Sequence, residues 1–550
     1  MAVKSSAAVY WAALGMAVLL PFGAIPPLLV TPWLPLSDDK LVLLVLLAAW
    51  LMLGRAALPT RQEWRALLPT AVLILLCIVS ARLAPPDNAA EALRYLTRLA
   101  AAAFVMLVAL RIGNARGLLW AVAVGAGLSG LLGIGEALRL APLEPVLALF
   151  KVAPTRVGGE LRVSASFQYA TIASMYFEMA APLAIVLAAT ARRVWLQVLG
   201  GAIAVVCTAN VVLSLTRAGV LTLIAMYAVL LVCGVWRLNW RFTLAPTLAS
   251  GAALVGGISL LFVHDQVFDM RLVTESDADW YGAVYSAPAT LSVRSNQPLS
   301  VEVDVRNAGR ITWTTSQNHP FVLGYRWLTD DGSGVLDITP SEVPLSHDVQ
   351  PGETIHLRPV LNVPNLPPGR YRLDWGMLQR DVLQFYERGW ADAETRVEVD
   401  GVAPGSMPGV TPRDDGEAPW VVGRLDLWGA ALKLAAAHPL VGLGPDNFRH
   451  FYGAELGLEG WDERVQANNV YLEVLADLGI IGLCVFLWVV AEPLRKAWAR
   501  LDDPLVLGAV LAIGAFLLHG MLDSFLAFAP TALLLWLLLG VAQKPQVSGR

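Results

Sequence analysis

The sequence contains little charge for its length. Only 15% of its 550 residues are Asp, Glu, Lys or Arg, whereas 56% are hydrophobic. Because soluble domains carry about 25% charged residues, this deficit predicts a chain that folds largely in lipid. The net charge is only −4, and no basic stripe is present to displace counterions from phosphates, so we expect no nucleic-acid partner.

Cysteine is also scarce. All four cysteines lie inside apolar runs (Cys77, Cys207, Cys233 and Cys484). We therefore expect no disulfide in a water-exposed domain. No CxxC or Cys/His spacing suggests zinc either, so the sequence predicts neither a metal nor a cofactor.

Common catalytic motifs are missing as well. No Walker motif, HExxH or GxSxG occurs, so ATP-driven transport and the usual hydrolase schemes lack support. The segment 125–130 fits GxGxxG, but it lies in an apolar run with no strand before it. We interpret it as small residues that allow helices to pack closely.

Long apolar runs are the main feature that is present. A membrane-spanning helix needs about 20 mostly apolar residues. Such runs occur near 8–31, 40–58, 66–83, 96–112, 117–137, 169–191, 195–215, 218–236, 243–263, 470–490, 504–522 and 525–542. Lys4 precedes the first run, which has no clear small-residue cleavage site, so we expect an uncleaved first helix. The expected fold is an all-α polytopic membrane protein of about 12 transmembrane helices with an inserted extracytoplasmic β-sandwich.

Basic residues predict the orientation. With the amino terminus inside, every inner connection is basic, through Arg55, Arg61, Arg65, Arg111, Arg116, Arg192, Arg193, Arg237, Arg241, Arg495, Lys496 and Arg500. By the positive-inside rule the long segment 264–469 then lies outside. We expect transmembrane helices in 1–263, an extracytoplasmic insertion in 264–424, an outer helix and loop in 425–469, and the last three spans with a cytoplasmic tail in 470–550.

The pattern changes to period-two alternation between about 285 and 400. Apolar residues alternate with charged ones from Val301 to Arg306, as in a half-buried strand. Further strand candidates are 322–328, 354–362, 370–376 and 395–400, and the expected core aromatics are Trp313, Trp327 and Trp375. These features favour an immunoglobulin-like sandwich. The simpler interpretation is a spacer or carbohydrate-facing lid without chemistry.

A linker and an outer helix are expected next. Residues 401–420 are rich in Pro, Gly and acidic residues, which is typical of a linker. Leu425, Trp428, Leu432 and Ala436 then recur at helical spacing, which predicts an amphipathic helix at the outer interface that ends at His438. A glycine-rich turn at 441–448 returns the chain toward the membrane.

Two charged residues stand out inside the apolar runs. Arg217 must lie at the tip of a tight hairpin between two spans, and a lone arginine near a bilayer costs about 2.5–3.5 kcal/mol without a partner. A pyrophosphate would suit its two-pronged guanidinium, although an arginine snorkelling to headgroups is equally compatible. Glu178 lies about a third of the way into its span and is either paired, for example with an arginine, or a proton acceptor.

Several other charges are expected on the outer face. Each alone is most often a solvated helix cap, but together they exceed what the topology requires (Arg94, Arg98, Glu136, Arg156, Arg162 and Asp523, which lies beside His519).

Five segments together resemble a known family. They are 438–448 (HPLVGLGPDNF), 468–473 (NNVYLE), 479–483 (GIIGL), 162–182 and 213–219. In this order, with Asp523 in a late span, they are similar to the O-antigen ligase and O-antigen polymerase family. The β-sandwich is an insertion outside that pattern.

The resemblance implies a metal-independent glycosyltransferase at the outer leaflet of the bacterial cytoplasmic (inner) membrane. Its partners would be an undecaprenyl-pyrophosphate-linked glycan donor, a saccharide or lipid-glycan acceptor, and the bilayer. Arginines would neutralise the pyrophosphate leaving group, and a base would activate the acceptor. The resemblance makes Arg217, Asn468 and Glu178 candidate catalytic residues, and Arg162, Asn469, Asp523 and His438 candidate substrate-binding residues.

One position departs from the family pattern. Ligases of the family place a histidine, as base, where this chain has Asn468. An amide cannot accept a proton at neutral pH, so either another residue is the base or ligase-type chemistry is lost. The possible replacements are His438, His450, Asp446 and Glu178.

Two other functions stay open. A flippase for lipid-linked sugar would usually show an internal repeat, and none is visible. A catalytically inactive member that binds glycan through the sandwich is compatible with the missing histidine.

Overall fold

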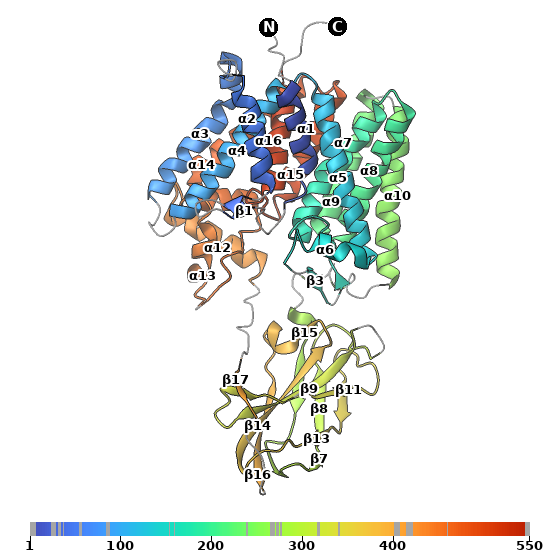
Figure 1. The fold of residues 1–550 in the computed structure, drawn as a ribbon, viewed down its shortest axis with the longest axis vertical. Helices are drawn as coiled ribbons and strands as arrows, with labels where there is room; N and C mark the ends of the chain where they lie inside the picture. Colours follow the sequence, from blue (N-terminus) through green and yellow to red (C-terminus); the bar gives the residue numbers. More distant parts are fainter. Residues whose placement is uncertain are drawn as a thin grey trace. The chain divides into compact units, whose positions relative to one another are not determined.

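The chain forms two compact units, which are described separately (Figure 1). The computed structural model describes residues 7–23, 29–30, 35–36, 38–53, 58–83, 89–152, 154–158, 160–237, 240–264, 270, 274, 278–315, 319–338, 341–400, 408–413, 422–458 and 460–544. The helical unit comprises Met1–Thr155, Leu161–His264 and Arg424–Arg550, and the β unit comprises Arg156–Glu160 and Asp265–Gly423.

A helix occupies each of the apolar runs. These helices are α1 (Ala7–Leu19), α2 (Asp38–Leu51), α3 (Arg61–Leu83), α4 (Ala89–Arg111), α5 (Ala115–Ala137), α7 (Ala170–Ala189), α8 (Val194–Leu213), α9 (Arg217–Arg237), α10 (Trp240–His264), α14 (Val470–Trp498), α15 (Pro504–His519) and α16 (Ala529–Gln543). Shorter elements are η3 (Ala141–Leu143), α6 (Glu144–Leu147), α12 (Arg424–Ala437) and α13 (Phe448–Glu455). Figure 1 shows α6, α12 and α13 at the same end of this unit.

The length and composition of the helices define a multi-pass membrane protein. Within the described residues, seven helices are long and apolar enough to cross a membrane, namely Arg61–Leu83, Ala92–Arg111, Ala115–Ala137, Ala170–Ala189, Val194–Leu213, Thr243–Leu260 and Val470–Trp498. Four further apolar helices are shorter. The count of twelve spans therefore stays a prediction.

The first predicted span is too long. The run 8–31 was expected to be one helix, but α1 ends at Leu19, and Leu29–Val30 (β1) pairs with Pro35–Leu36 (β2). Pro21 explains the early end, because proline lacks the N–H that a helix needs and disfavours helical geometry in the residue before it.

Helix α7 forms the centre of the helical unit. Its residues are buried from Ile172 to Ala188, so a polar side chain in this part of α7 faces protein on every side. Small residues allow close approach elsewhere, as the sequence predicted for 125–130. A Cβ on Gly125 would lie 2.4 Å from the carbonyl oxygen of Val18 in α1, which leaves room only for glycine.

The β unit contains an eight-stranded sheet and smaller sheets. The large sheet has the order β17-β10-β9-β14-β16-β6, with β11 on β9 and β15 on β14. Its strands are β6 (Thr290–Arg294), β9 (Phe321–Thr329), β10 (Gly334–Leu336), β11 (Ser341–Pro344), β14 (Gly369–Gln379), β15 (Leu383–Gln384), β16 (Ala393–Asp400) and β17 (Val410–Pro412). All neighbours pair antiparallel except β16 and β6.

The smaller sheets correct one predicted strand. The sheet β12-β8-β5 is built from Thr354–Leu357, Val303–Asn307 and Ala283–Ser286, and β13 (Val360–Asn362) pairs with β7 (Pro298–Ser300). The range 354–362 was expected to be continuous, but Pro359 divides it into β12 and β13, which pair with different partners. Proline cannot donate to a strand ladder, so the chain changes sheets there.

Aromatic residues fill the core of the β unit, as predicted. Trp313 and Trp375 are fully buried and Trp327 is 2% exposed. Trp313 also packs against Phe321 and Phe385. The immunoglobulin-like topology stays a prediction.

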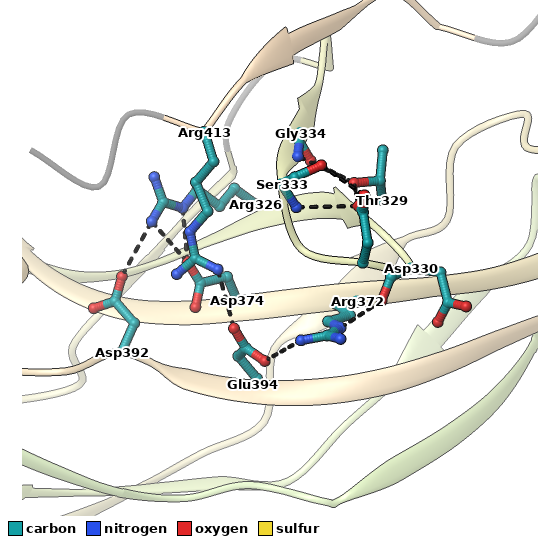
Figure 2. Close-up of polar contacts among 11 residues, drawn as sticks. Arg326, Thr329, Asp330, Ser333, Gly334, Arg372, Asp374, Asp392, Glu394 and Arg413 are labelled. Carbon is teal, nitrogen blue, oxygen red and sulfur yellow. Dashed lines mark hydrogen bonds and ion pairs between the residues drawn. The ribbon is translucent and has the colours of Figure 1, made fainter.

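A charged network ties β17 to this sheet (Figure 2). The buried carboxylate of Asp374 accepts hydrogen bonds from the guanidinium groups of Arg326, at 2.8 Å, and Arg413, at 3.4 Å. Arg413 also reaches Glu394 at 3.0 Å, and Glu394 pairs with Arg372. Burial raises the pKa of Asp374 against the pull of Arg326, whereas the hydrogen bond from Arg413 lowers that of Glu394.

The predicted linker is partly a strand. Residues 410–412 were expected to be linker but form β17, which pairs with β10 from Gly334 to Leu336. Residues 401–407 and 414–421 of that range lie outside the described residues.

Candidate active site of the helical unit

The segment 438–448 packs into a break in α14. At Gly479 the helix has φ 68° and ψ −172°, which interrupts its backbone hydrogen bonds. The preceding segment supplies the missing partners through bonds from Leu443 N to Ala476 O, Gly444 N to Asp477 O and Ile480 N to Pro439 O, at 2.9–3.0 Å. Irregular backbone at membrane depth is tolerated where protein covers it in this way.

Two glycines make this approach possible. A Cβ on Gly442 would lie 2.3 Å from the backbone carbonyl of Asp477, and one on Gly479 would lie 2.3 Å from that of Leu440. Both glycines have φ 68°, where a side chain would also strain the backbone. The buried hydroxyl of Ser80, on α3, donates to Val441 O at 2.6 Å and closes the contact from the other side.

Asp477 caps the helix that follows the glycine-rich turn. Its carboxylate accepts from the backbone N–H groups of Asp446, Asn447 and Phe448 at 2.8–3.2 Å. A carboxylate at a helix N-terminus satisfies donors that the helix cannot. The Asp446 carboxylate is held in turn by Arg449 at 3.4 Å.

The two adjacent asparagines have different environments. The Asn469 side chain caps α14 by accepting from Tyr471 N and Leu472 N, and its amide nitrogen donates to Met521 O at 2.9 Å. Asn468 is half-buried with φ 49°, and its backbone carbonyl accepts a hydrogen bond from the Trp428 indole at 3.3 Å. Asn469 therefore positions the start of α14, a role that the sequence analysis did not foresee.

The predicted tight hairpin at 213–219 is present. Helix α8 ends at Leu213 and α9 begins at Arg217, with a left-handed residue, Leu215, between them. Arg162 holds this hairpin, because its guanidinium donates to Ser214 O at 3.0 Å and to the Thr216 hydroxyl at 3.2 Å. Arg162 and Arg217 thus belong to one local structure.

A buried ion pair fixes the segment that carries Arg162. Lys151 lies 2.6 Å from Glu136 and donates to Ser164 at 2.7 Å. The other oxygen of Glu136 accepts from the backbone N–H groups of Ser164 and Ala165. Burial lowers the pKa of Lys151 from its ordinary value, and the Glu136 carboxylate opposes that shift.

Glu178 pairs with a histidine. His519, the last residue of α15, brings its Nδ1 to 2.9 Å from Glu178 Oε2, and both side chains are buried. The Ser174 hydroxyl donates to Glu178 Oε1 at 2.6 Å. A Cβ on Gly219 would lie 2.5 Å from that same oxygen, so α9 touches the pair two residues after Arg217.

The surroundings of His519 connect the pair to two more charged residues. Asp523 and Arg424, the first residue of α12, both lie close enough to act on its imidazole electrostatically. The ring packs edge-on against Phe525 at 4.9 Å between centroids. Helices α7, α9 and α15 therefore meet around Glu178 and His519.

Two candidate histidines lie elsewhere. His438 is exposed just beyond the end of α12. The end of α12 that lies near His519 is the opposite one, at Arg424, which is about 20 Å from His438 at 1.5 Å per residue. His450 faces Glu463 at 3.2 Å. The sequence analysis noticed His519 but gave it no role. His519 in one apolar run and Glu178 in another could have been predicted to pair, because ionisable groups in membrane spans usually have a partner.

Among the residues that the structure describes, no group of three or more His, Cys, Asp or Glu side chains is placed to hold a metal ion. All four cysteines are free, as predicted.

These features define a class, a multi-pass membrane protein that carries an additional β unit and a buried polar site. Residues 382–487 match the family model described as O-antigen ligase. The match confirms the resemblance to the O-antigen ligase family. It covers the end of the β unit, α12, α13 and the first part of α14, so it begins inside the insertion that was expected to lie outside the family pattern. Among curated proteins, none matches the chain.

Proposed function

We propose that the protein is a membrane glycosyltransferase of the O-antigen ligase and polymerase type. It transfers or polymerises glycan from an undecaprenyl-pyrophosphate carrier at the outer leaflet of the bacterial cytoplasmic membrane. The observation that carries this proposal is the family match at 382–487, which includes the turn and helix that complete the polar site. The basic inner loops support an outer position for that site.

The reaction requires a residue that binds the pyrophosphate leaving group. The acceptor hydroxyl attacks the anomeric carbon, the bond from that carbon to phosphate breaks, and the electron pair leaves on the pyrophosphate. Arg217 stabilises that developing charge, because guanidinium binds two phosphate oxygens at once. Arg162 supports it by bonding to Ser214 and Thr216 of the same hairpin.

The remaining candidates have more limited support. Asp523 is half-buried near His519, and this position supports a role in contacting the acceptor. Asn468 directly precedes the N-cap of α14, and its amide orients the acceptor hydroxyl by hydrogen bonds. The Asn469 amide is already used in capping, and His438 is exposed at the far end of α12, so neither position favours substrate binding.

Replacing Arg217 tests the proposal. In Arg217→Ala we expect glycan transfer to fall about 100- to 1,000-fold, as for the loss of one charge-stabilising group, with normal membrane insertion. Arg193→Ala is the matched control, because Arg193 is exposed at the opposite end of α8. Transfer is measured by mass analysis of carrier-linked and surface glycans. Full activity of Arg217→Ala would contradict the assignment.

The same analysis separates the two activities. Without the protein, single repeat units accumulate on the carrier if it is a polymerase, whereas long carrier-linked chains accumulate if it is a ligase.

A further inference from the structure

The buried imidazole of His519 has one nitrogen in use and one that is not. Nδ1 faces both oxygens of Glu178, at 2.9 and 3.1 Å. Nε2 is buried and has no hydrogen-bond partner among the described residues. Burying a polar atom without a partner lowers stability, so a purely structural pair does not explain the second nitrogen.

The Glu178 contact determines which nitrogen can act as a base. A carboxylate accepts, so Nδ1 carries the proton and Nε2 presents its lone pair. A carboxylate that fixes the tautomer and orientation of a histidine is the arrangement that general-base catalysis uses. His519 is thus prepared to take a proton at Nε2.

The position of the pair joins it to the pyrophosphate hairpin. Gly219 contacts both Ser174 and Glu178, and Arg217 lies two residues before it. Asp523 and Arg424 lie within electrostatic range of the same imidazole. Arg217 begins the helix whose Gly219 meets the pair, so a sugar whose pyrophosphate is held at this hairpin would lie near it, whereas His450 is already occupied by Glu463.

We propose that His519 is the general base of the transfer reaction and that Glu178 is its positioning residue. This proposal rests on the proposed function and supplies the base that Asn468 cannot be. His519 Nε2 takes the proton of the acceptor hydroxyl as its oxygen bonds to the anomeric carbon. The bond from that carbon to the pyrophosphate breaks, the carrier pyrophosphate leaves with the electron pair, and the protonated imidazole then returns its proton to water.

The test uses the purified full chain with a carrier-linked glycan donor and an acceptor glycan. In His519→Gln we expect kcat to fall about 100- to 10,000-fold, the usual contribution of a general base, with unchanged donor binding. Glu178→Gln should lower kcat with little change in KM. His356→Gln is the matched control, because His356 also pairs with a carboxylate, Asp304, but is exposed in the β unit.

Chemical rescue separates catalysis from structure. Added imidazole should restore part of the turnover of His519→Ala, because free imidazole replaces the missing base, but should not restore Arg217→Ala. If wild type is active and His519→Gln keeps kcat within about threefold, well short of a general base's contribution, the base assignment is wrong while the proposed function stands.

Two other outcomes would overturn the base assignment or the proposed function. If the His519 and Glu178 variants lose donor binding and turnover in proportion, with a lower melting temperature and no rescue, the pair is structural and the proposal fails. If wild type itself transfers no glycan, the proposed function fails first.

Discussion

Gly219 shows how closely single atoms are fitted at the site. A Cβ there would lie 2.2 Å from the Ser174 hydroxyl and 2.5 Å from Glu178 Oε1. Both atoms are ends of side chains, so they can move aside while the helices stay in place. Alanine at this position therefore disturbs the Glu178 pair without unfolding the protein.

We predict that Gly219→Ala inserts and melts like wild type but transfers glycan at least about 10-fold more slowly, since a displacement of about 1 Å is enough for such a loss. The control is Gly251→Ala in α10, where a Cβ has nothing within 4 Å. Both variants gain helix propensity, so only the contact differs. Equal activity of the two would show that the fit at Glu178 is unimportant.

Residue-level prediction succeeded locally and failed over distance. The position of Arg217 in a tight hairpin followed from the length of two apolar runs. The partner of Glu178 could not be found in this way, because His519 is 341 positions away in the sequence. Helical periodicity carries no information about which distant helix packs against which face.

At the level of elements, the broken helix α14 is the most constrained feature. Gly442 approaches the backbone of Asp477 and Leu478, and backbone atoms cannot move aside as side chains can. Its positive φ alone makes a side chain there cost about 1–3 kcal/mol.

We predict that Gly442→Ala lowers the melting temperature in detergent and reduces the amount of protein in the membrane. The matched control is Gly457→Ala, which has a similar φ of 72° but nothing within 4 Å of its Cβ. The control experiences the strain without the clash, so the difference in melting temperature measures the contact. Identical melting of both variants would contradict the close packing.

Element boundaries were predictable where composition changes sharply. Apolar runs located the helices and period-two alternation located most strands. The break in α14 was missed because its run, apolar apart from Glu473 and Asp477, has no proline near Gly479 to mark it. In α12 the stripe of Leu425 and Leu432, predicted to lie at the outer interface, is exposed, while a second stripe with Leu427 and Leu434 is buried against protein. Periodicity predicted only the first of these two stripes, and its place at the interface stays a prediction.

For the molecule as a whole, the stability of the β unit depends on a charge network that spans several strands. Arg413 joins the end of β17 to Asp374 and Glu394 (Figure 2). Its side chain is 17% exposed, so solvent screens it only in part.

We predict that Arg413→Ala destabilises the β unit by about 1–3 kcal/mol and speeds hydrogen exchange in β10. Arg358→Ala, which breaks the exposed pair with Glu302, should cost at most about 1 kcal/mol. Protection in β10 equal to that of Arg358→Ala would contradict this role.

The effect of Arg413→Ala should shrink in acid. The pKa of Glu394 is lowered in the fold, so its stabilisation is present above the ordinary value of 4.5 and is lost as the pH falls. The pKa of Asp374 is raised, so its buried charge costs stability at neutral pH, and this cost disappears on protonation. Hydrogen exchange measured at neutral and acidic pH checks the direction of both pH effects.

The division into two units was visible in the sequence as a change of period, but the charge network was not. Arg326, Asp374 and Arg413 come from separate strands and meet only through the order of the sheet, which alternation does not specify.

The long separation between Glu178 and His519 has a consequence for synthesis. Ribosomes add about 5–20 residues per second, so these 341 positions correspond to roughly 20–70 s of translation at that rate. During this interval the carboxyl has Ser174 but no imidazole, while residues 265–423 of the β unit are synthesised. A nascent chain therefore holds an incomplete Glu178–His519 pair until almost the last helix emerges.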